Sequence, residues 1–312
     1  MSKKYVFGVD VGGTTVKLGF FDVEGTLIDK WEIPTRTADG GKNILPDVAD
    51  SIKAKMAEKN VTKEEVAGVG VGTPGPVDSQ GIVYGAVNLG WGVFSLKDAL
   101  SELLDMPVMA GNDANIAALG EMWKGGGQGH TNLVAVTLGT GVGGGIIVEG
   151  KVVTGSVGAG GEIGHIHVED NETEMCACKK YGCLEQYSSA TGIVRLAKRR
   201  LAKDDTPSAI RKDNVTAKDV FDAVKAGDAL AIEVAEQFGD YLGKGMAIIA
   251  VALNPEIFVV GGGVSKAGEV LFDYIVPAFK KYSFSAVHNA KFAIATLGND
   301  AGIYGAAKLV LG

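Results

Sequence analysis

Three short glycine clusters in this chain contain the residue types that bind phosphate groups. The first follows an apolar run and comprises Asp10, Gly12, Gly13, Thr14, Thr15 and Lys17. Backbone amides and threonine hydroxyls in such a turn can surround a phosphate, and a carboxylate at the strand end offers an oxygen ligand to a phosphate-bound Mg²⁺. A tight hairpin without a ligand is the ordinary alternative. A second cluster, Gly139, Thr140 and Gly141, repeats the pattern and favours phosphate binding.

Neither cluster is a Walker A loop. Both lack the GKS or GKT ending, and the second reads as a hairpin rather than a strand-to-helix turn. The third cluster follows an apolar run and comprises Gly261, Gly262 and Gly263. Glycines at the end of a strand let the backbone approach a purine or a ribose closely. Alone, such a run is more often a plain turn, but its place after two phosphate-type turns favours nucleotide binding.

Asn112 and Asp113 stand where a predicted strand, 108–110, meets a predicted helix, 114–123. An ordinary N-cap is one interpretation of this pair. The other is a general base, because a helix N-terminus keeps a carboxylate ionised and phosphoryl transfer asks little of the group that accepts the hydroxyl proton. The Asn112 amide, with one donor group and one acceptor, would then suit neighbouring hydroxyls of the acceptor.

All three cysteines of the chain fall between positions 176 and 183, in the spacing C-x-C-x4-C. Clustered thiols in a protein without secretion signals favour a metal site over a disulfide framework, and three thiolates with one imidazole complete a tetrahedral zinc shell. Reduced thiols in a loop are the alternative. His165 and His167 both lie upstream, and local spacing does not choose between them. A closed shell of four ligands predicts a structural zinc ion.

The composition narrows the class of protein. The chain has 312 residues, which favours two domains with a cleft between them. No apolar run approaches the roughly 18 residues that cross a bilayer, and the N-terminus does not resemble a signal peptide. We therefore expect a cytoplasmic protein without a membrane role. A net charge of -7 opposes the broad basic surface that nucleic-acid binding needs, so we also expect no nucleic-acid partner.

The elements that position these residues occur in two similar sets. Strands are predicted at 5–10, 16–21 and 27–33, and again at 133–138, 144–148 and 151–154. Each set places a Gly/Thr turn between its first and second strands and a Glu-Gly turn between its second and third. Two copies in the same order indicate an internal duplication and paired domains of related topology.

Further elements follow from apolar periodicity and capping residues. Helices are predicted at 44–59, 114–123, 191–202, 217–226, 228–253 and 301–311, strands at 66–71, 108–110 and 256–260, and a surface loop at 203–213. The strand at 66–71 ends at the turn Thr73-Pro74-Gly75-Pro76.

The ordered set of motifs resembles the ROK family of bacterial sugar kinases and repressors, and within it the glucokinases. The motifs are GVDVGGTTVKLG, TPGPVD, NLGW, GNDANIAALGE, LGTGVGGGI, GAGGEIGH, CACKKYGCLE and VVGGGVS, and they cover essentially the whole chain. The resemblance implies an α/β protein with the two-domain actin-like, RNase H-like ATPase fold, in which a duplicated mixed sheet is flanked by helices. We expect a smaller N-terminal domain, 1–115 with 299–312, and a larger domain, 116–298, that carries the zinc loop.

The resemblance also implies roles for individual residues. Asp113 would be the catalytic base. The sugar would be bound by Gly75, Asn88, Asn112, Asp113, Glu162, His165 and Glu185, and zinc by His165, Cys176, Cys178 and Cys183. ATP and Mg²⁺ would be held by the three glycine clusters. The sequence departs from the family pattern at Lys179, where the family has glycine, and in a His165-to-Cys176 interval one residue longer than usual.

The expected activity is ATP-dependent phosphorylation of glucose to glucose 6-phosphate. The alternative within the family is a kinase for N-acetylmannosamine, fructose or mannose, because those substrates share the hydroxyl-binding residues. A sugar-sensing repressor is a more remote alternative, since it would need a helix-turn-helix domain before the first strand, where four residues precede Tyr5. Glucose or a related hexose and ATP are the expected ligands, and a homodimer or larger homo-oligomer is the expected assembly.

Overall fold

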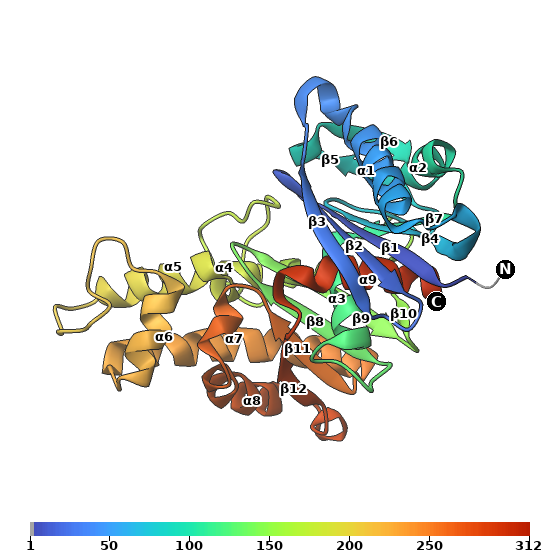
Figure 1. Ribbon diagram of the computed structural model, residues 1–312. Coiled ribbons are helices and arrows are strands. Elements are labelled where there is room, and N and C mark those ends of the chain that lie inside the picture. The colour runs from blue at the N-terminus through green and yellow to red at the C-terminus, as the bar shows by residue number, and fades with distance from the viewer. Residues whose placement is uncertain (1–2) are drawn as a thin grey trace. The chain divides into compact units, whose positions relative to one another are not determined.

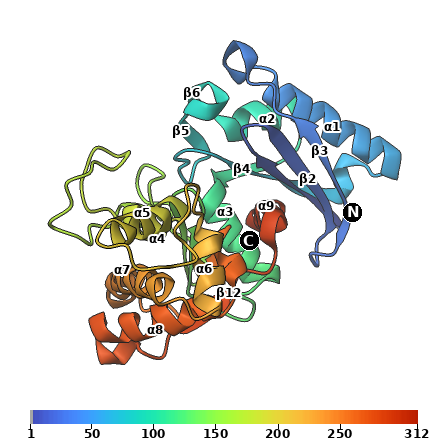
Figure 2. The same ribbon diagram turned by 90° about the vertical axis from the view of Figure 1, so that its left-hand side faces the viewer.

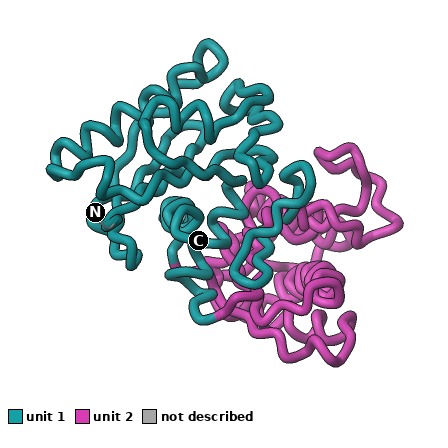
Figure 3. Tube along the Cα trace, turned by 90° about the vertical axis from the view of Figure 1, so that its right-hand side faces the viewer, with its two compact units in different colours: residues 1–129, 145–161, 297–312 teal, residues 130–144, 162–296 magenta. Residues whose placement is uncertain are grey.

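The computed structural model describes residues 3–312, which form two compact units (Figure 3). The described part of unit 1 consists of residues 3–129, 145–161 and 297–312, and unit 2 consists of residues 130–144 and 162–296. The domains expected from the sequence, 1–115 with 299–312 and 116–298, differ from these units in where they place 116–129, 145–161 and 297–298. Helix α3 (Asp113–Lys124) belongs to unit 1 because it packs against the C-terminal helix α9 (Ala301–Leu311), and the segment 145–161 contains the short strand Lys151–Val152, which also contacts α3.

Unit 1 is built on a five-stranded sheet in the order β3-β2-β1-β4-β7 (Figure 1). Its strands are β1 (Tyr5–Val11), β2 (Thr15–Asp22), β3 (Leu27–Pro34), β4 (Val66–Thr73) and β7 (Val108–Asn112). The first three form the antiparallel meander predicted from the sequence, whereas β4 and β7 run parallel to β1. The inner strands β1 and β4 are almost wholly buried, as strands covered on both faces must be.

Helices cover both faces of this sheet. On one face, α1 (Ile44–Lys59) and α2 (Leu96–Leu104) share an apolar core with Phe7 and Val9. On the other, α9 packs against Val6 and Phe21. This contact is close, because a Cβ atom at Gly70 in β4 would lie 1.7 Å from the carbonyl oxygen of Ala306. A small hairpin of β5 (Ile82–Ala86) and β6 (Trp91–Ser95), which the sequence did not predict, completes the region before α2.

The second sheet has the order β10-β9-β8-β11-β12. Its strands are β8 (Leu133–Leu138), β9 (Val142–Val148), β10 (Lys151–Val152), β11 (Ile257–Gly261) and β12 (Lys291–Ile294). Both sheets therefore place their first three strands in the order third, second, first, followed by two later strands. In the second sheet as in the first, those later strands are parallel to the first strand. The matching order is what the duplication inferred from the sequence predicts.

The helices of unit 2 are α4 (Glu185–Ser188), α5 (Ala190–Leu201), α6 (Ala217–Lys225), α7 (Ala229–Leu253) and α8 (Val270–Tyr282) (Figure 2). The predicted helices at 191–202, 217–226 and 228–253 correspond to α5, α6 and α7, and the predicted loop at 203–213 is irregular and largely exposed. Pro277 interrupts the helical pattern of α8, which the sequence did not predict. Within residues 3–312, none of the helices combines the length and the apolar character that a membrane span requires.

Candidate active site

Two of the predicted residues of unit 1, Asp10 and Asn112, lie near the carboxyl ends of its parallel strands. Asp10 near the end of β1 is in register with Gly72 of β4, and Thr73 at the end of β4 is in register with Asn112 of β7. The acidic residue and the amide therefore flank the end of β4. In open α/β sheets this edge is where ligands bind.

Asn112, rather than Asp113, caps helix α3. Its Oδ1 accepts hydrogen bonds from the backbone amides of Ala114 at 3.0 Å and Asn115 at 3.2 Å. Its Nδ2 donates to the carbonyl oxygen of Gly75 at 3.0 Å, which ties α3 to the turn after β4. Asp113 is the first residue of the helix and is exposed. The N-cap interpretation thus applies to Asn112, and the Asp113 carboxylate lies at the positive end of the helix dipole.

Asp10 lies close enough to Asp113 for the two carboxylates to influence each other. Burial raises the pKa of Asp10 to about 6, the Lys17 ammonium opposes this rise, and the negative charge of Asp113 adds to it. Two neighbouring carboxylates, one of them half-buried, repel each other when both are ionised and no cation is present. The pair is therefore a favourable site for a divalent cation, whose positive charge would offset this repulsion.

The turn between β1 and β2 is held by Thr35, the residue that follows β3. The amide of Gly12 donates to Thr15 O at 3.0 Å, and the hydroxyl of Thr35 donates to Gly12 O at 2.7 Å. Gly13 and Thr14 at the tip are exposed. Lys17 donates to the backbone carbonyl of Asn299 at 3.1 Å, so this conformation directs its ammonium to the segment before α9.

The two remaining sugar-site predictions in unit 1 differ in their surroundings. Gly75 has φ 87°, a conformation that favours glycine, and its carbonyl is the acceptor for Asn112. Asn88 lies in a short 3-10 turn between β5 and β6 and is exposed. The structure therefore links Gly75 directly to the start of α3, and the sugar-binding roles of both Gly75 and Asn88 stay predictions.

In unit 2, the turn at Gly139–Gly141 is held by the N-terminus of α5. The amide of Ala190 donates to Gly139 O at 2.8 Å, and the hydroxyl of Thr191 donates to Thr140 O at 2.8 Å. The helix is capped by Ser189, whose Oγ accepts from the amide of Gly192 at 3.0 Å. A helix N-terminus beside a glycine-rich turn is a favourable environment for phosphate groups.

The third glycine cluster lies beside this turn. Strand β11 runs parallel to β8, with Gly261 in register with Thr137. Gly262 has φ 84°, and a Cβ atom there would lie 2.5 Å from the carbonyl oxygen of Leu138. This close approach requires glycine, and it brings the second and third clusters together within unit 2.

Two adjoining pockets extend from these clusters, and both lie within unit 2. One, of about 280 Å³, is lined by Gly263 and Val264 together with residues of α6 such as Phe221. The other, of about 520 Å³, includes Thr140 and Thr191. Both share the set Ala190, Thr216 and Ala217. The sequence did not single out these three residues. The capping box formed by Thr216 and Asp219 signals the start of α6, but not its part in a pocket.

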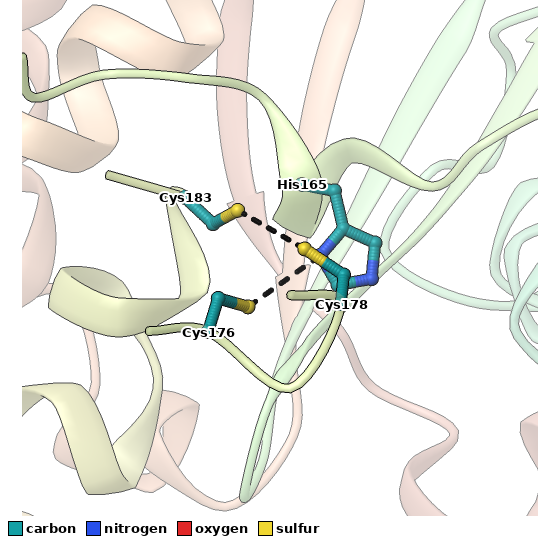
Figure 4. Close-up of side chains that lie close together, drawn as sticks. All are labelled: His165, Cys176, Cys178 and Cys183. Carbon is teal, nitrogen blue, oxygen red and sulfur yellow. Dashed lines mark hydrogen bonds between the residues drawn. The ribbon is translucent and has the colours of Figure 1, made fainter. Parts of the chain in front are cut away.

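The predicted zinc ligands lie together in unit 2 (Figure 4). The ligand atoms of His165, Cys176, Cys178 and Cys183 are all within 4.8 Å of one another. The sulfur atoms of Cys178 and Cys183 are 3.5 Å apart, and Cys176 Sγ is 3.9 Å from His165 Nδ1. A tetrahedral zinc ion would separate such ligand atoms by about 3.5 to 3.8 Å. Both the donor set and its spacing therefore fit zinc.

The structure separates the two candidate histidines. His167 directs Nδ1 to the carbonyl oxygen of Tyr181 at 2.9 Å and Nε2 to Asp170 at 2.8 Å, so both of its ring nitrogens are engaged away from the thiols. His165 is the histidine of the cluster. Lys179, the departure from the family pattern, has φ 66° in the turn between the cysteines. This left-handed conformation explains a glycine at that position in the family pattern, and here the turn forms with lysine.

Glu185 connects the cluster to the second glycine turn. Its Oε1 lies 2.9 Å from Cys176 Sγ, and its Oε2 would be 2.7 Å from a Cβ atom at Gly141. Burial raises the pKa of the Cys176 thiol, and the Glu185 carboxylate raises it further, so a cation is needed to hold this sulfur as a thiolate. Glu162, the remaining predicted sugar ligand, is exposed, and its carbonyl oxygen accepts the amide of His165 at 3.2 Å. Within unit 2, Glu185 thus lies between the cysteine–histidine cluster and the phosphate-type turn.

A buried ion-pair network anchors the segment that carries the first two cysteines. The Glu172 side chain is 1% exposed and pairs with Arg195 and Arg199 of α5. The hydroxyl of Tyr187 also donates to it. Burial alone would raise the pKa of Glu172, but the hydrogen bonds from Arg199 and Tyr187 and the charge of Arg195 bring that pKa well below its usual range. The network joins the cysteine segment to the helix that holds the Gly139–Gly141 turn.

Comparisons with known proteins identify the family of this chain. The model of the ROK family matches residues 6–312. The chain belongs to the ROK family. Among its relatives is a glucokinase of Halalkalibacterium halodurans, which is 48% identical over 99% of this chain and 96% of that protein.

Two solved ROK structures are similar over nearly all of the chain. The ROK hexokinase of Thermus thermophilus aligns with a TM-score of 0.81 and 31% identity over 97% of each chain. The ROK family glucokinase of Streptomyces griseus, solved in complex with glucose and AMPPNP, aligns with a TM-score of 0.73 and 35% identity over 98% of each chain. The actin-like α/β fold expected from the family resemblance is thereby confirmed.

Proposed function

We propose that this ROK protein is an ATP-dependent glucokinase that transfers the γ-phosphoryl group of ATP to the 6-hydroxyl of glucose. The observation that carries this proposal is the similarity over nearly the whole chain to ROK glucokinases, one of them bound to glucose and an ATP analogue. The site residues described above support it, because phosphate-type turns, an exposed carboxylate at a helix start and a metal-binding loop all occur in this one chain.

Asp113 is the proposed general base. A carboxylate at the first position of a helix stays ionised at neutral pH, and a weak base suffices for a loose phosphoryl-transfer transition state. It would accept the proton of the 6-hydroxyl as the oxygen attacks the phosphorus atom. Asn112 would bind a neighbouring hydroxyl through the hydrogen-bonding capacity that its cap and its bond to Gly75 leave available. Asp10 would face the Mg²⁺ that accompanies ATP.

In unit 2, the Gly139–Gly141 turn and the N-terminus of α5 would bind the phosphates of ATP. The two pockets that share Thr216 and Ala217 would hold the adenosine. His165, Glu162 and Glu185 would bind sugar hydroxyls. A zinc ion bound by His165 and the three cysteines would supply structural order to that loop, since four protein ligands leave no position for a reacting water.

A coupled assay across several sugars tests the substrate. With ATP and Mg²⁺ present, we expect kcat/KM for glucose to exceed that for mannose, fructose and N-acetylmannosamine by at least about tenfold, a discrimination of roughly 1.4 kcal/mol in transition-state binding. A higher kcat/KM for another hexose would identify that sugar as the preferred substrate instead of glucose. If none of these sugars is phosphorylated, the proposed sugar kinase activity is wrong.

We further propose that the enzyme acts in the cytoplasm as a homodimer or larger homo-oligomer. Two apolar side chains of α7, Ile248 and Val251, are 46% and 59% exposed, which supports an assembly that covers this helix. Size-exclusion chromatography with light scattering measures the assembly directly, and a monomeric mass at micromolar concentration would contradict it.

A further inference from the structure

The chain passes between its two units at four places, after residues 129, 144, 161 and 296. Helix α3, which begins with Asp113, contacts a residue near each of these places. All of the contacts lie within unit 1, so they are part of its internal structure. The helix that carries the proposed base is therefore also the element on which the connections are fixed.

Glu121, near the end of α3, holds the first and last connections. Its side chain is buried, with 4% of the residue exposed. Oε2 accepts the amide of Gly126 at 2.8 Å, just before the first passage, and Oε1 accepts the amide of Leu297 at 2.9 Å, the first residue after the last passage. One carboxylate thus binds two backbone segments that are 171 residues apart in sequence, from 126 to 297.

The fit around this carboxylate is tight. A Cβ atom at Gly125 would lie only 2.0 Å from Glu121 Oε2, so any larger residue there would displace the carboxylate. Buried carboxylates are costly unless hydrogen bonds satisfy their oxygens, and here two backbone amides do so. Glu121 is not among the residues proposed above to bind nucleotide, sugar or metal, so the proposed chemistry leaves it without a role.

The two middle connections also contact α3. A Cβ atom at Gly145 would lie 2.9 Å from the carbonyl oxygen of Ala114 and 2.4 Å from the side chain of Ala118. The side chain of Asn115 donates to the carbonyl oxygen of Gly160 at 3.1 Å. Asn115 is two residues from Asp113, so the third connection is held close to the proposed base.

We propose that Glu121 is a positioning residue for phosphoryl transfer. By binding Gly126 and Leu297 to α3, it couples the connections between the units to the helix whose first residue is Asp113. Loss of either hydrogen bond would let a connection move without α3, and the base would then be less well aligned when the phosphoryl group is transferred. This inference rests on the proposed kinase function and adds a residue that touches neither sugar nor nucleotide.

Two variants test the proposal from opposite sides of the contact. Glu121→Gln keeps the shape of the side chain, but its amide group presents a donor to one of the two backbone amides. Gly125→Ala keeps Glu121 and displaces its carboxylate. In both, we expect kcat for glucose to fall at least tenfold with a smaller change in KM, and the ratio of ATP hydrolysed to glucose phosphorylated to rise, because a poorly aligned acceptor competes less well with water.

Hydrogen–deuterium exchange supplies a readout that does not depend on activity. We expect faster exchange in peptides containing residues 125–129 and 297–300, with little change in the strands of either sheet. The matched controls are Glu102→Gln, an exposed residue of α2, and Gly92→Ala, where a Cβ atom meets open space. Both controls should retain wild-type kinetics and exchange.

The outcomes separate this inference from the proposed function. Wild-type exchange at both peptides in Glu121→Gln, or faster exchange with unchanged kcat and an unchanged hydrolysis ratio, would overturn the positioning role while leaving the kinase intact. An inactive wild-type protein would instead refute the proposed function. Thermal melting identifies a variant that has simply unfolded. If one of the two variants is unfolded, the kinetics and exchange of the other decide whether Glu121 has the positioning role.

Discussion

Three carboxylates of unit 1 have different environments and, on our interpretation, different tasks. Asp10 is half-buried at a strand end, and burial raises its pKa to about 6. Asp113 is exposed at the first position of a helix. Glu121 is buried and hydrogen-bonded to two backbone amides. The same functional group can thus face a metal ion, accept a proton or hold the backbone, depending on its burial and its donors.

The role of Asp113 is open to a direct test. Replacing it with alanine removes the proposed base but leaves the Asn112 cap intact, so we expect the protein to fold and to bind glucose. Turnover should fall by about 10³-fold, within the range that general base catalysis contributes. Steady-state kinetics measure the first effect and titration calorimetry the second. Asp50→Ala, an exposed change on α1, is the control. Near-normal turnover in Asp113→Ala would remove this residue from the base role.

At the scale of elements, the loop from β10 to α4 is held by two different sets of contacts. The cysteine cluster closes the loop on itself, and Glu172 fastens it to α5 through Arg195 and Arg199. Because α5 also holds the Gly139–Gly141 turn, the proposed sugar and phosphate regions of unit 2 share one support. Changes in either set of contacts should therefore affect both stability and ligand binding.

Metal removal tests the first set of contacts. We expect the purified protein to contain about one zinc ion per chain, as a single four-ligand site holds. Dialysis against a strong chelator should lower the melting temperature and the affinity for glucose, while nucleotide binding to the pockets beside Thr216 changes less. Cys178→Ser should reproduce the effect without a chelator. Metal-free protein with full activity would show that the thiols serve another purpose.

The buried ion pair of Glu172 provides a pH-dependent test of the second set of contacts. Its folded-state pKa is lowered, so its stabilising effect is complete above the unfolded-state value near 4.3 and is lost as the pH falls toward the folded-state value. At pH 7, Glu172→Gln should lower the free energy of unfolding by about 3 kcal/mol, because two arginines lose a buried partner.

Denaturant unfolding at pH 7 and pH 4 measures this difference. The gap between wild type and Glu172→Gln should narrow at the lower pH, because the unfolded wild-type chain begins to take up a proton at Glu172 near pH 4 while the folded protein keeps this carboxylate ionised. Glu236→Gln, an exposed change on α7, should leave the stability unchanged at both values. An equal gap at pH 7 and pH 4 would contradict the ion-pair explanation.

At the scale of the whole molecule, local sequence patterns predicted most of the regular elements. The helices α1 and α9 and the strand β8 begin and end at the predicted residues, because their apolar periodicity is strong and their ends carry turn or capping residues. Helix α8 was missed because Pro277 lies within it, and β12 because it is short. The glycine clusters were recognisable from the sequence because the conformation of such turns is determined by residues that are adjacent in the chain.

The contacts that join distant segments could not be predicted in this way. Glu121 meets Leu297 and Glu172 meets Arg199 only after the chain has folded, and nothing in the local pattern marks either glutamate. Similarly, Thr216 reads as a helix cap and becomes part of a pocket only because β11 brings Gly263 beside it. Such pairings are set by tertiary packing, which a single sequence read locally does not reveal.

The matching strand order of the two sheets shows where the two halves of the chain differ most. In the first sheet, residues 35–65 connect the third strand to the fourth, whereas in the second the corresponding connection runs from 153 to 256 and contains the cysteines and α4 to α7. The same strand order thus accommodates crossovers of very different length. In the second sheet the longer crossover adds the cysteine loop and the helices that line the two pockets, while the five strands keep their order.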